Sequence, residues 1–156
     1  MNKLQQEIQK TGEQLKKLQE QLEATKTITI ETAQPGDTLP DGCVVIERYE
    51  DSVLLAAPYI TQIRCQWTPE FPEVFKKLKV HGFIPAQWHV PSLKELHLAN
   101  RSLGKNGEKL FSPVRFWSST EFSSTHAFNV DFNFIIATCP VKTDTCWVRA
   151  FRHVYL

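Results

Sequence analysis

The first 26 residues carry apolar side chains at spacings that alternate between three and four. This repeat is that of the seam of a left-handed coiled coil, and the intervening Gln, Glu and Lys suit exposed helical positions. A seam this narrow needs partner helices, so we predict a self-associating helix over residues 1–26. The alternative is one amphipathic helix lying on its own domain. The seam positions are Met1, Leu4, Ile8, Thr11, Leu15, Leu18, Leu22 and Thr25.

The pattern changes after this helix. Residues 27–40 are rich in Thr, Pro, Gly and Asp, which is typical of a linker. We therefore place a globular domain at residues 41–156. It opens with two apolar-rich segments, 43–48 and 52–57, on either side of the polar pair 50–51, and this arrangement predicts a β-hairpin.

Two helices are predicted in the middle of the chain. Apolar residues on one face indicate a helix over residues 70–79. The second helix is placed at residues 92–101, because Ser92 stands three residues before Glu95, the spacing of a capping box.

The last third of the chain is predicted to be β-structure. Apolar and polar residues alternate over 128–134 and again over 147–154, as in half-buried strands. The segment between them, residues 135–146, has neither the alternation of a packed strand nor clear turn chemistry. Strands, then helices, then strands indicate an α+β fold, and a patternless segment on such a frame indicates a surface used for recognition.

Composition narrows the classes of function. The chain has 156 residues, 42% hydrophobic and 11% aromatic, which suits a folded globular protein. The net charge of +1 and the scattered basic residues argue against nucleic acid as a partner. No apolar run of about eighteen residues and no signal-peptide pattern is seen, so we expect synthesis in the cytoplasm without membrane insertion. A phage structural protein and a mature chain whose leader was removed both fit this expectation.

The sequence offers little chemistry of an enzymatic kind. It contains no P-loop, no dinucleotide fingerprint and no HExxH motif, and its five histidines lack the spacing of metal ligands. Asp131 and Asp144 are candidate calcium ligands, but ordinary strand and loop positions are the preferred interpretation. We therefore predict no enzyme activity, no cofactor and no metal. The chain has four cysteines, Cys43, Cys65, Cys139 and Cys146, and we favour free thiols for all of them. A Cys139–Cys146 bridge is an open alternative.

Three short motifs in a fixed order carry a resemblance to a known family. They are WHVPSLKEL at 88–96, FWSSTE at 116–121 and VRAFR at 148–152. Together they resemble the bacterial and phage domains of the C-type-lectin-like fold that are related to the C-terminal domain of a Legionella collagen-like adhesin. The resemblance covers roughly residues 35–156 and implies that fold for the domain. His89 stands where this family more often has Arg.

One subgroup of this family is diversified by retroelements, through adenine-directed mutagenesis of AAC codons for Asn. Every residue over 123–141 belongs to the set that such mutagenesis produces. The resemblance therefore implies a variable binding surface on a fixed framework formed by residues 116–121 and 147–152. The candidate ligand-binding residues are Ser124, Thr125, His126, Phe128, Asp131, Asn133, Phe134, Ile135, Ile136, Ala137, Thr138, Cys139, Thr143, Asp144, Thr145 and Cys146.

The resemblance also guides the expected partners. It favours a homotrimer over a dimer through residues 1–26, with a cell-surface protein or glycan as the ligand and a phage virion or bacterial surface as the place of action. One alternative is a fixed phage tail or fibre-tip component or an adhesin. A second alternative is an oxidase of the formylglycine-generating type, with Cys139 and Cys146 as copper ligands, although the motifs around these cysteines do not match that enzyme.

Overall fold

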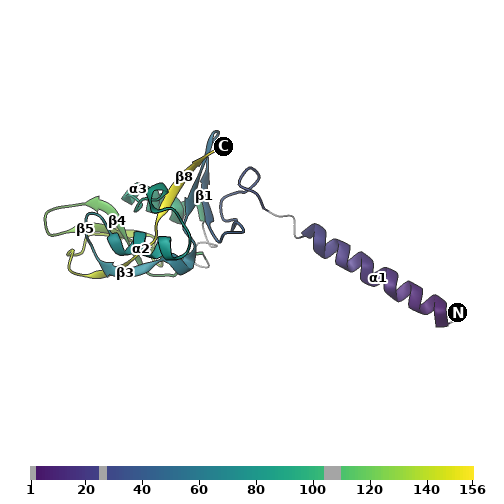
Figure 1. Cartoon of the computed structure of the whole chain (residues 1–156). Coiled ribbons are helices and arrows are strands. Elements are labelled where there is room, and N and C mark those ends of the chain that lie inside the picture. The colour runs from purple at the N-terminus through teal and green to yellow at the C-terminus, as the bar shows by residue number, and fades with distance from the viewer. Residues whose placement is uncertain (1–2, 25–27, 104–109) are drawn as a thin grey trace.

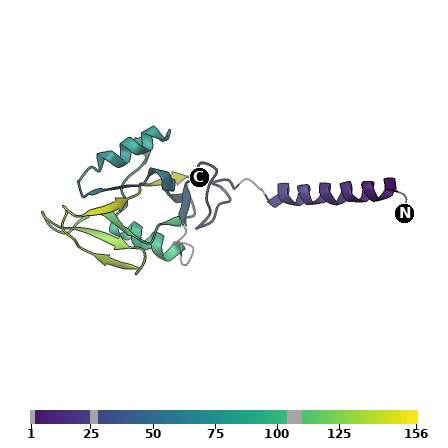
Figure 2. The ribbon, with the colours of Figure 1, turned by 90° about the horizontal axis from the view of Figure 1, so that it is seen from below.

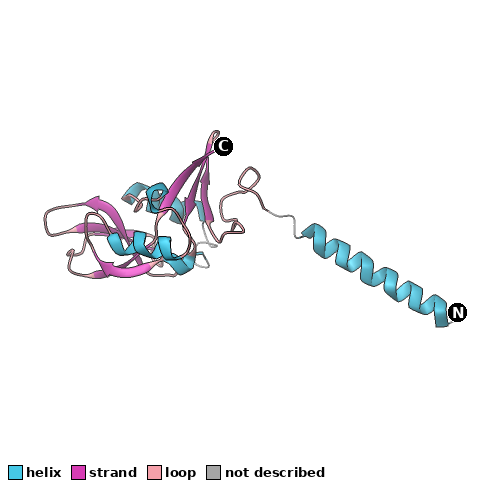
Figure 3. Ribbon diagram, viewed as in Figure 1, coloured by secondary structure: helices cyan, strands magenta, loops and turns pink. Residues whose placement is uncertain are grey.

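A computed structural model of the chain describes residues 3–24, 28–103 and 110–156. The described part is a mixed α+β structure with three α-helices and two β-sheets (Figure 1), in agreement with the predicted α+β class. No described helix has the length and apolar character needed to cross a membrane. Most connections between the elements are loops rather than regular structure (Figure 3).

The N-terminal helix, α1, runs from Lys3 to Ala24 and stands clear of the domain (Figures 1 and 2). Three predicted seam residues, Ile8, Leu15 and Leu18, are exposed along it. The alternative of a helix lying on its own domain is therefore not the arrangement seen in the single chain. The predicted seam ends, Met1 and Thr25, lie outside the described residues.

The predicted hairpin is confirmed as β1 (Val44–Arg48) and β2 (Ser52–Ala56). Strand β8 (Phe151–Tyr155) pairs with β2, which gives a three-stranded antiparallel sheet in the order β1-β2-β8. Every residue of β2 is buried, so this strand is covered on both faces, as its unbroken apolar run Val-Leu-Leu-Ala requires.

The two remaining α-helices lie on opposite sides of the domain (Figure 2). Helix α2 (Pro72–Val80) packs Val74 and Leu78 into one apolar cluster, with Val53 and Leu55 of β2. Helix α3 (Leu93–Leu103) packs into a second cluster, with Leu54 and Ala56 of the same strand. Alternate residues of β2 thus face different helices, which makes this strand the centre of the core.

The second sheet has five strands in the order β3-β7-β4-β5-β6. Strands β4 and β7 meet in a parallel bridge, and the other neighbours in this sheet are antiparallel. The strand bounds are Ile63–Gln66 for β3, Arg115–Glu121 for β4, Ala127–Asp131 for β5, Ile136–Thr138 for β6 and Thr145–Val148 for β7. Two short 3-10 helices, η1 (Tyr59–Thr61) and η2 (Pro85–Gln87), complete the domain.

Two strand predictions need correction. The strand predicted over 128–134 ends at Asp131, where a turn begins. The closing strand predicted over 147–154 is two strands in different sheets, β7 and β8. The break falls at Arg149, whose guanidinium donates hydrogen bonds to the carbonyls of Ala57 and Leu110. Beyond it the chain changes sheets: the carbonyl of Ala150 accepts the N–H of Ala57, and β8 pairs with β2 rather than with the neighbours of β7.

The segment predicted as a linker, 27–40, packs against the domain over its described part. Arg48 of β1 donates to the carbonyl oxygen of Ile30 at 2.9 Å and to that of Ala33 at 3.2 Å. Ala33 is fully buried, and the N–H of Gly36 donates to the carbonyl of Val45 at 2.8 Å. The chain between α1 and β1 is therefore part of the folded domain from about residue 30 onward.

Candidate functional site

The turn between β5 and β6 forms the centre of the candidate site, and it is built on Asp131. One carboxylate oxygen of this residue accepts the backbone N–H of Asn133 at 2.9 Å and that of Phe134 at 3.4 Å. The other oxygen accepts Nε of Arg115 at 3.3 Å. Asp131 is therefore buried and was wrongly predicted to face outward, because its carboxylate supplies the acceptors that the turn backbone needs.

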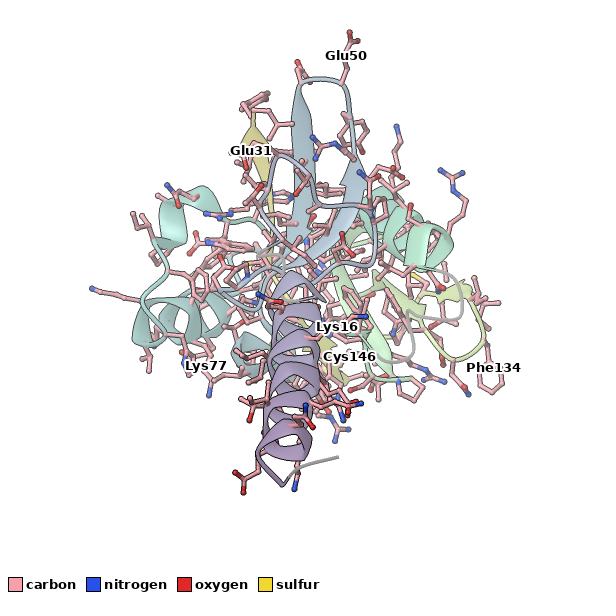
Figure 4. All side chains as sticks on the ribbon, turned by 90° about the vertical axis from the view of Figure 1, so that its right-hand side faces the viewer. Lys16, Glu31, Glu50, Lys77, Phe134 and Cys146 are labelled. Carbon is pink, nitrogen blue, oxygen red and sulfur yellow. The ribbon has the colours of Figure 1, made fainter. Side chains whose placement is uncertain are left out.

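The turn carries three consecutive exposed apolar residues. Phe134 is 67% exposed, Ile135 64% and Ile136 51%. Figure 4 shows Phe134 projecting from the periphery of the domain. A contiguous run of this kind is unfavourable in water and is typical of a surface that binds another molecule.

Ile135 also has an unusual backbone. Its φ is 59°, in the left-handed region, which a β-branched residue adopts at a cost of about 1–2 kcal/mol. Phe71, at φ 41°, has the same feature, but its ring is buried in the core beside Trp67. No comparable burial offsets the strain at Ile135, since its side chain is exposed.

Beside this turn lies a cleft of about 680 Å³. Six of the predicted binding residues line it, namely Asp131, Asn133, Phe134, Asp144, Thr145 and Cys146. It also contains residues that the sequence analysis missed: Arg64, Pro113, Val114, Arg115, Asn129, Pro140 and Trp147. Charges of both signs and two aromatic rings make this surface suited to hydrogen bonding and stacking rather than to purely apolar contact.

A buried amide forms part of the cleft wall. Asn129 of β5 donates to the sulfur of Cys146 at 3.3 Å and accepts a hydrogen bond from the hydroxyl of Thr138 in β6 at 2.5 Å. Cys146 is buried against this amide, so its prediction as an outward-facing residue is wrong. Asn129 links β5, β6 and β7 through two side-chain contacts and thereby fixes the cleft.

A second group of predicted residues lies at the other end of β5, about 17 Å away along the strand. It comprises Ser124, Thr125 and His126, in the loop that follows β4. Lys142 ties this loop to its neighbours: its ammonium group lies 2.9 Å from Glu121, 3.2 Å from the carbonyl of Ser124 and 4.3 Å from the ring centre of Trp67. The structure thus separates the candidate residues into two groups.

The predicted binding residues also differ in exposure. Ser124, Thr125, Asn133, Ala137, Thr143, Asp144 and Thr145 are exposed, and His126, Phe128, Thr138 and Cys139 are half-buried. The predicted framework motif is buried where it packs. Trp117 donates its Nε1–H to the carbonyl of Cys65 at 3.0 Å, and Ser118 donates its hydroxyl to that of Phe128 at 2.8 Å.

A separate polar cluster surrounds Glu95 of α3. Glu95 and Ser92 form the predicted capping box, with the Ser92 N–H donating at 2.8 Å and the Glu95 N–H donating to the Ser92 hydroxyl at 3.2 Å. The ring of His89 lies 2.7 Å from the same carboxylate and is stacked on that of His153. Burial raises the pKa of Glu95, but the hydrogen bonds from His89 and Ser92 outweigh it and hold the pKa at about 2.

Two cations of the predicted framework lie over aromatic rings. Arg149 lies over the ring of Phe111 and Arg152 over that of Trp88, at 4.5 Å and 4.8 Å from the ring centres. Among residues 3–24, 28–103 and 110–156, no group of three or more acidic, His or Cys side chains is arranged to hold a metal ion.

A scan of the chain against protein-family models finds no match. A search of curated proteins finds no match either.

Proposed function

We propose that the protein is a non-enzymatic binding protein of the C-type-lectin-like class, with a retroelement-diversified surface carried on a trimeric coiled-coil stalk. Its ligand would be a protein or glycan on a cell surface, and its place of action a phage virion or bacterial surface. The binding surface would consist of the β5–β6 turn, the adjoining cleft and the exposed residues that follow β6.

The backbone of Ile135 is the observation that carries this proposal. Besides Gly, Asn is the residue that most readily adopts the left-handed conformation found there. A site whose backbone favours Asn, but which carries Ile, is the expected product of adenine mutagenesis at an AAC codon. Selection for fold stability alone would not favour an exposed β-branched residue at this position.

The division between buried and exposed positions gives independent support. Phe116 and Trp117 of the framework motif are fully buried, whereas Asn133, Phe134 and Ile135 are exposed. Side chains at such exposed turn positions can differ without changing the core. The turn itself is held from within by Asp131, so its backbone does not depend on the identity of the exposed side chains.

The exposed seam of α1 supports the trimeric part of the proposal. Ile8, Leu15 and Leu18 would be covered in a coiled coil, which removes apolar surface from water. Three copies of a weak site on one stalk bind a surface far more tightly than one copy does. Sedimentation of a chain that begins at residue 28 is expected to give a monomer, and an oligomer of unchanged size would contradict the role of α1.

The decisive experiment is to sequence the DNA around the gene in several close relatives. We expect a reverse transcriptase gene and a template repeat with adenines at the codons for exposed residues of 123–146. Codons for the buried framework, 116–118, serve as the internal control and should not vary. Uniform DNA across 123–146 would rule out diversification and favour a fixed tail or fibre-tip component.

A further inference from the structure

Two of the four cysteines face each other across neighbouring strands. Cys65 of β3 is the direct register partner of Cys146 of β7. The two strands are antiparallel, so directly opposite side chains point to the same face of the sheet. Both cysteines are free thiols in the structure, and both pack against the same apolar cluster.

This placement meets the geometric needs of a disulfide. Directly opposite residues of an antiparallel pair have Cα atoms about 4.5–5.5 Å apart and Cβ atoms about 4.5–5.5 Å apart. A disulfide requires Cα atoms about 4.4–6.8 Å apart and Cβ atoms about 3.5–4.5 Å apart. The Cα separation therefore lies within the disulfide range, and the two strands need to approach by only about 1 Å to bring the Cβ atoms into theirs.

The two thiols differ in access. Cys65 is half-buried and lies near one edge of the five-stranded sheet, since β3 is its outermost strand. Cys146 is buried, and its sulfur accepts the hydrogen bond from Asn129. Burial raises the pKa of both thiols, that of Cys65 to about 11, so only a small fraction of either is thiolate at neutral pH and the exchange is slow.

We propose that Cys65 and Cys146 are a modification site that closes to a cross-strand disulfide when the protein meets a low-molecular-weight disulfide such as oxidised glutathione. The Cys65 thiolate attacks one sulfur of glutathione disulfide, the S–S bond breaks, and one glutathione thiolate leaves. The Cys146 thiolate then attacks the Cys65 sulfur of the mixed disulfide and releases the second glutathione thiolate. The two cysteine thiols are oxidised, the glutathione disulfide is reduced, and the two thiol protons pass to the departing thiolates.

The bond would act on the cleft as well as on the fold. Cys146 lines the cleft, and its sulfur is the acceptor that holds the amide of Asn129. Drawing this sulfur toward Cys65 weakens that contact, and Asn129 in turn holds Thr138 of β6. Oxidation is therefore expected to tie β3 to β7 and to change the wall of the cleft.

The test uses the full chain, incubated at about pH 8.5, where the thiolate fraction is larger than at neutral pH, with either oxidised or reduced glutathione. With oxidised glutathione we expect two of the four thiols to be lost, and peptide mapping to find a Cys65–Cys146 link without retained glutathione. The linked form should unfold at a temperature about 10 °C higher, because the bond closes a long loop in the unfolded chain.

Matched variants separate this pair from the other thiols. Cys139→Ser should still lose two thiols, whereas Cys65→Ser should lose none to an internal bond. Cys65 is the better residue to replace because it is half-buried, and the unfolding temperature of the reduced variant reports whether it folds. A Cys139–Cys146 link, or stable glutathione adducts with no link to Cys65, would overturn the proposal.

Discussion

Replacing Ile135 by Asn should stabilise the domain relative to the same replacement at the next residue. Full burial of an isoleucine side chain stabilises a fold by about 1.5–3 kcal/mol. Because both isoleucines are more than half exposed, replacing either by Asn removes less than half of this stabilisation, or about 1 kcal/mol. Only Ile135 has a left-handed backbone, whose relief by Asn returns about 1–2 kcal/mol. Ile135→Asn is thus expected to lie near neutral, and Ile136→Asn to destabilise the domain by about 1 kcal/mol or slightly more.

The difference between the two variants isolates the backbone contribution. A gap of about 1–2 kcal/mol corresponds to about 2–8 °C in the midpoint of thermal unfolding for a domain of this size. Urea unfolding followed by tryptophan fluorescence measures the same gap, because Trp67, Trp88 and Trp117 are buried in the folded state. The urea dependence of the unfolding free energy should be equal in both variants.

Equal destabilisation by the two replacements would refute the reasoning. It would mean that the backbone at residue 135 carries no strain in solution, and the main support for a diversified Asn codon would fall with it. Ile135→Gly provides a check on the mechanism. This replacement relieves the same strain, but it also makes the unfolded chain more flexible. Its gain in stability should therefore be smaller than the relief of backbone strain alone would give.

Three further outcomes are expected. Glu95→Gln should cost about 1–2 kcal/mol at pH 7, a value discounted because the carboxylate is 20% exposed. The folded pKa of Glu95 lies below its ordinary value, so the ionised carboxylate stabilises the fold above about pH 4.5 and this stabilisation is lost as the pH falls toward 2. The variant should therefore lack this part of the acid unfolding transition, which circular dichroism measures. Arg149→Lys should cost about 2–4 kcal/mol in urea unfolding, because a lysine cannot donate to two carbonyls in the same planar geometry, and an unchanged midpoint would contradict this. Lys142→Met should speed amide hydrogen exchange in residues 122–126 with little change in global stability, whereas unaltered exchange would show that Lys142 does not hold the loop.

Local patterns in the sequence predicted much of the fold. The hairpin and the helix capped by Ser92 and Glu95 follow from rules that act over a few residues, and both were placed within two residues of their observed bounds. One failure of strand prediction has a local cause, because the Asp131 carboxylate accepts the N–H groups of Asn133 and Phe134 and turns the chain. The other has a long-range cause: the chain passes from β7 to β8 because β8 pairs with the distant strand β2, and no local pattern reveals such a partner.

The candidate site was only partly predictable for the same reason. Exposure of Ile135 and Ile136 agrees with the patternless run of residues there, since no core constrains them, whereas the alternation over 128–134 wrongly places Phe134 on the apolar face of a strand. The role of Cys146 as an internal support depends on a contact across strands, whereas that of Asp131 rests on hydrogen bonds from the turn that follows it. Arg64 enters the cleft only because β3 pairs with β7, and these two strands are about 80 residues apart in the chain.

The position of β8 has a practical consequence. This strand pairs with β2, and the N–H of Leu156 donates to the carbonyl of Asp51 at 3.0 Å, so the chain ends beside the hairpin and not on the five-stranded sheet (Figure 1). A passenger protein genetically fused after Leu156 would leave the β5–β6 turn uncovered. Libraries randomised at the exposed turn could therefore be screened with a reporter attached at that end.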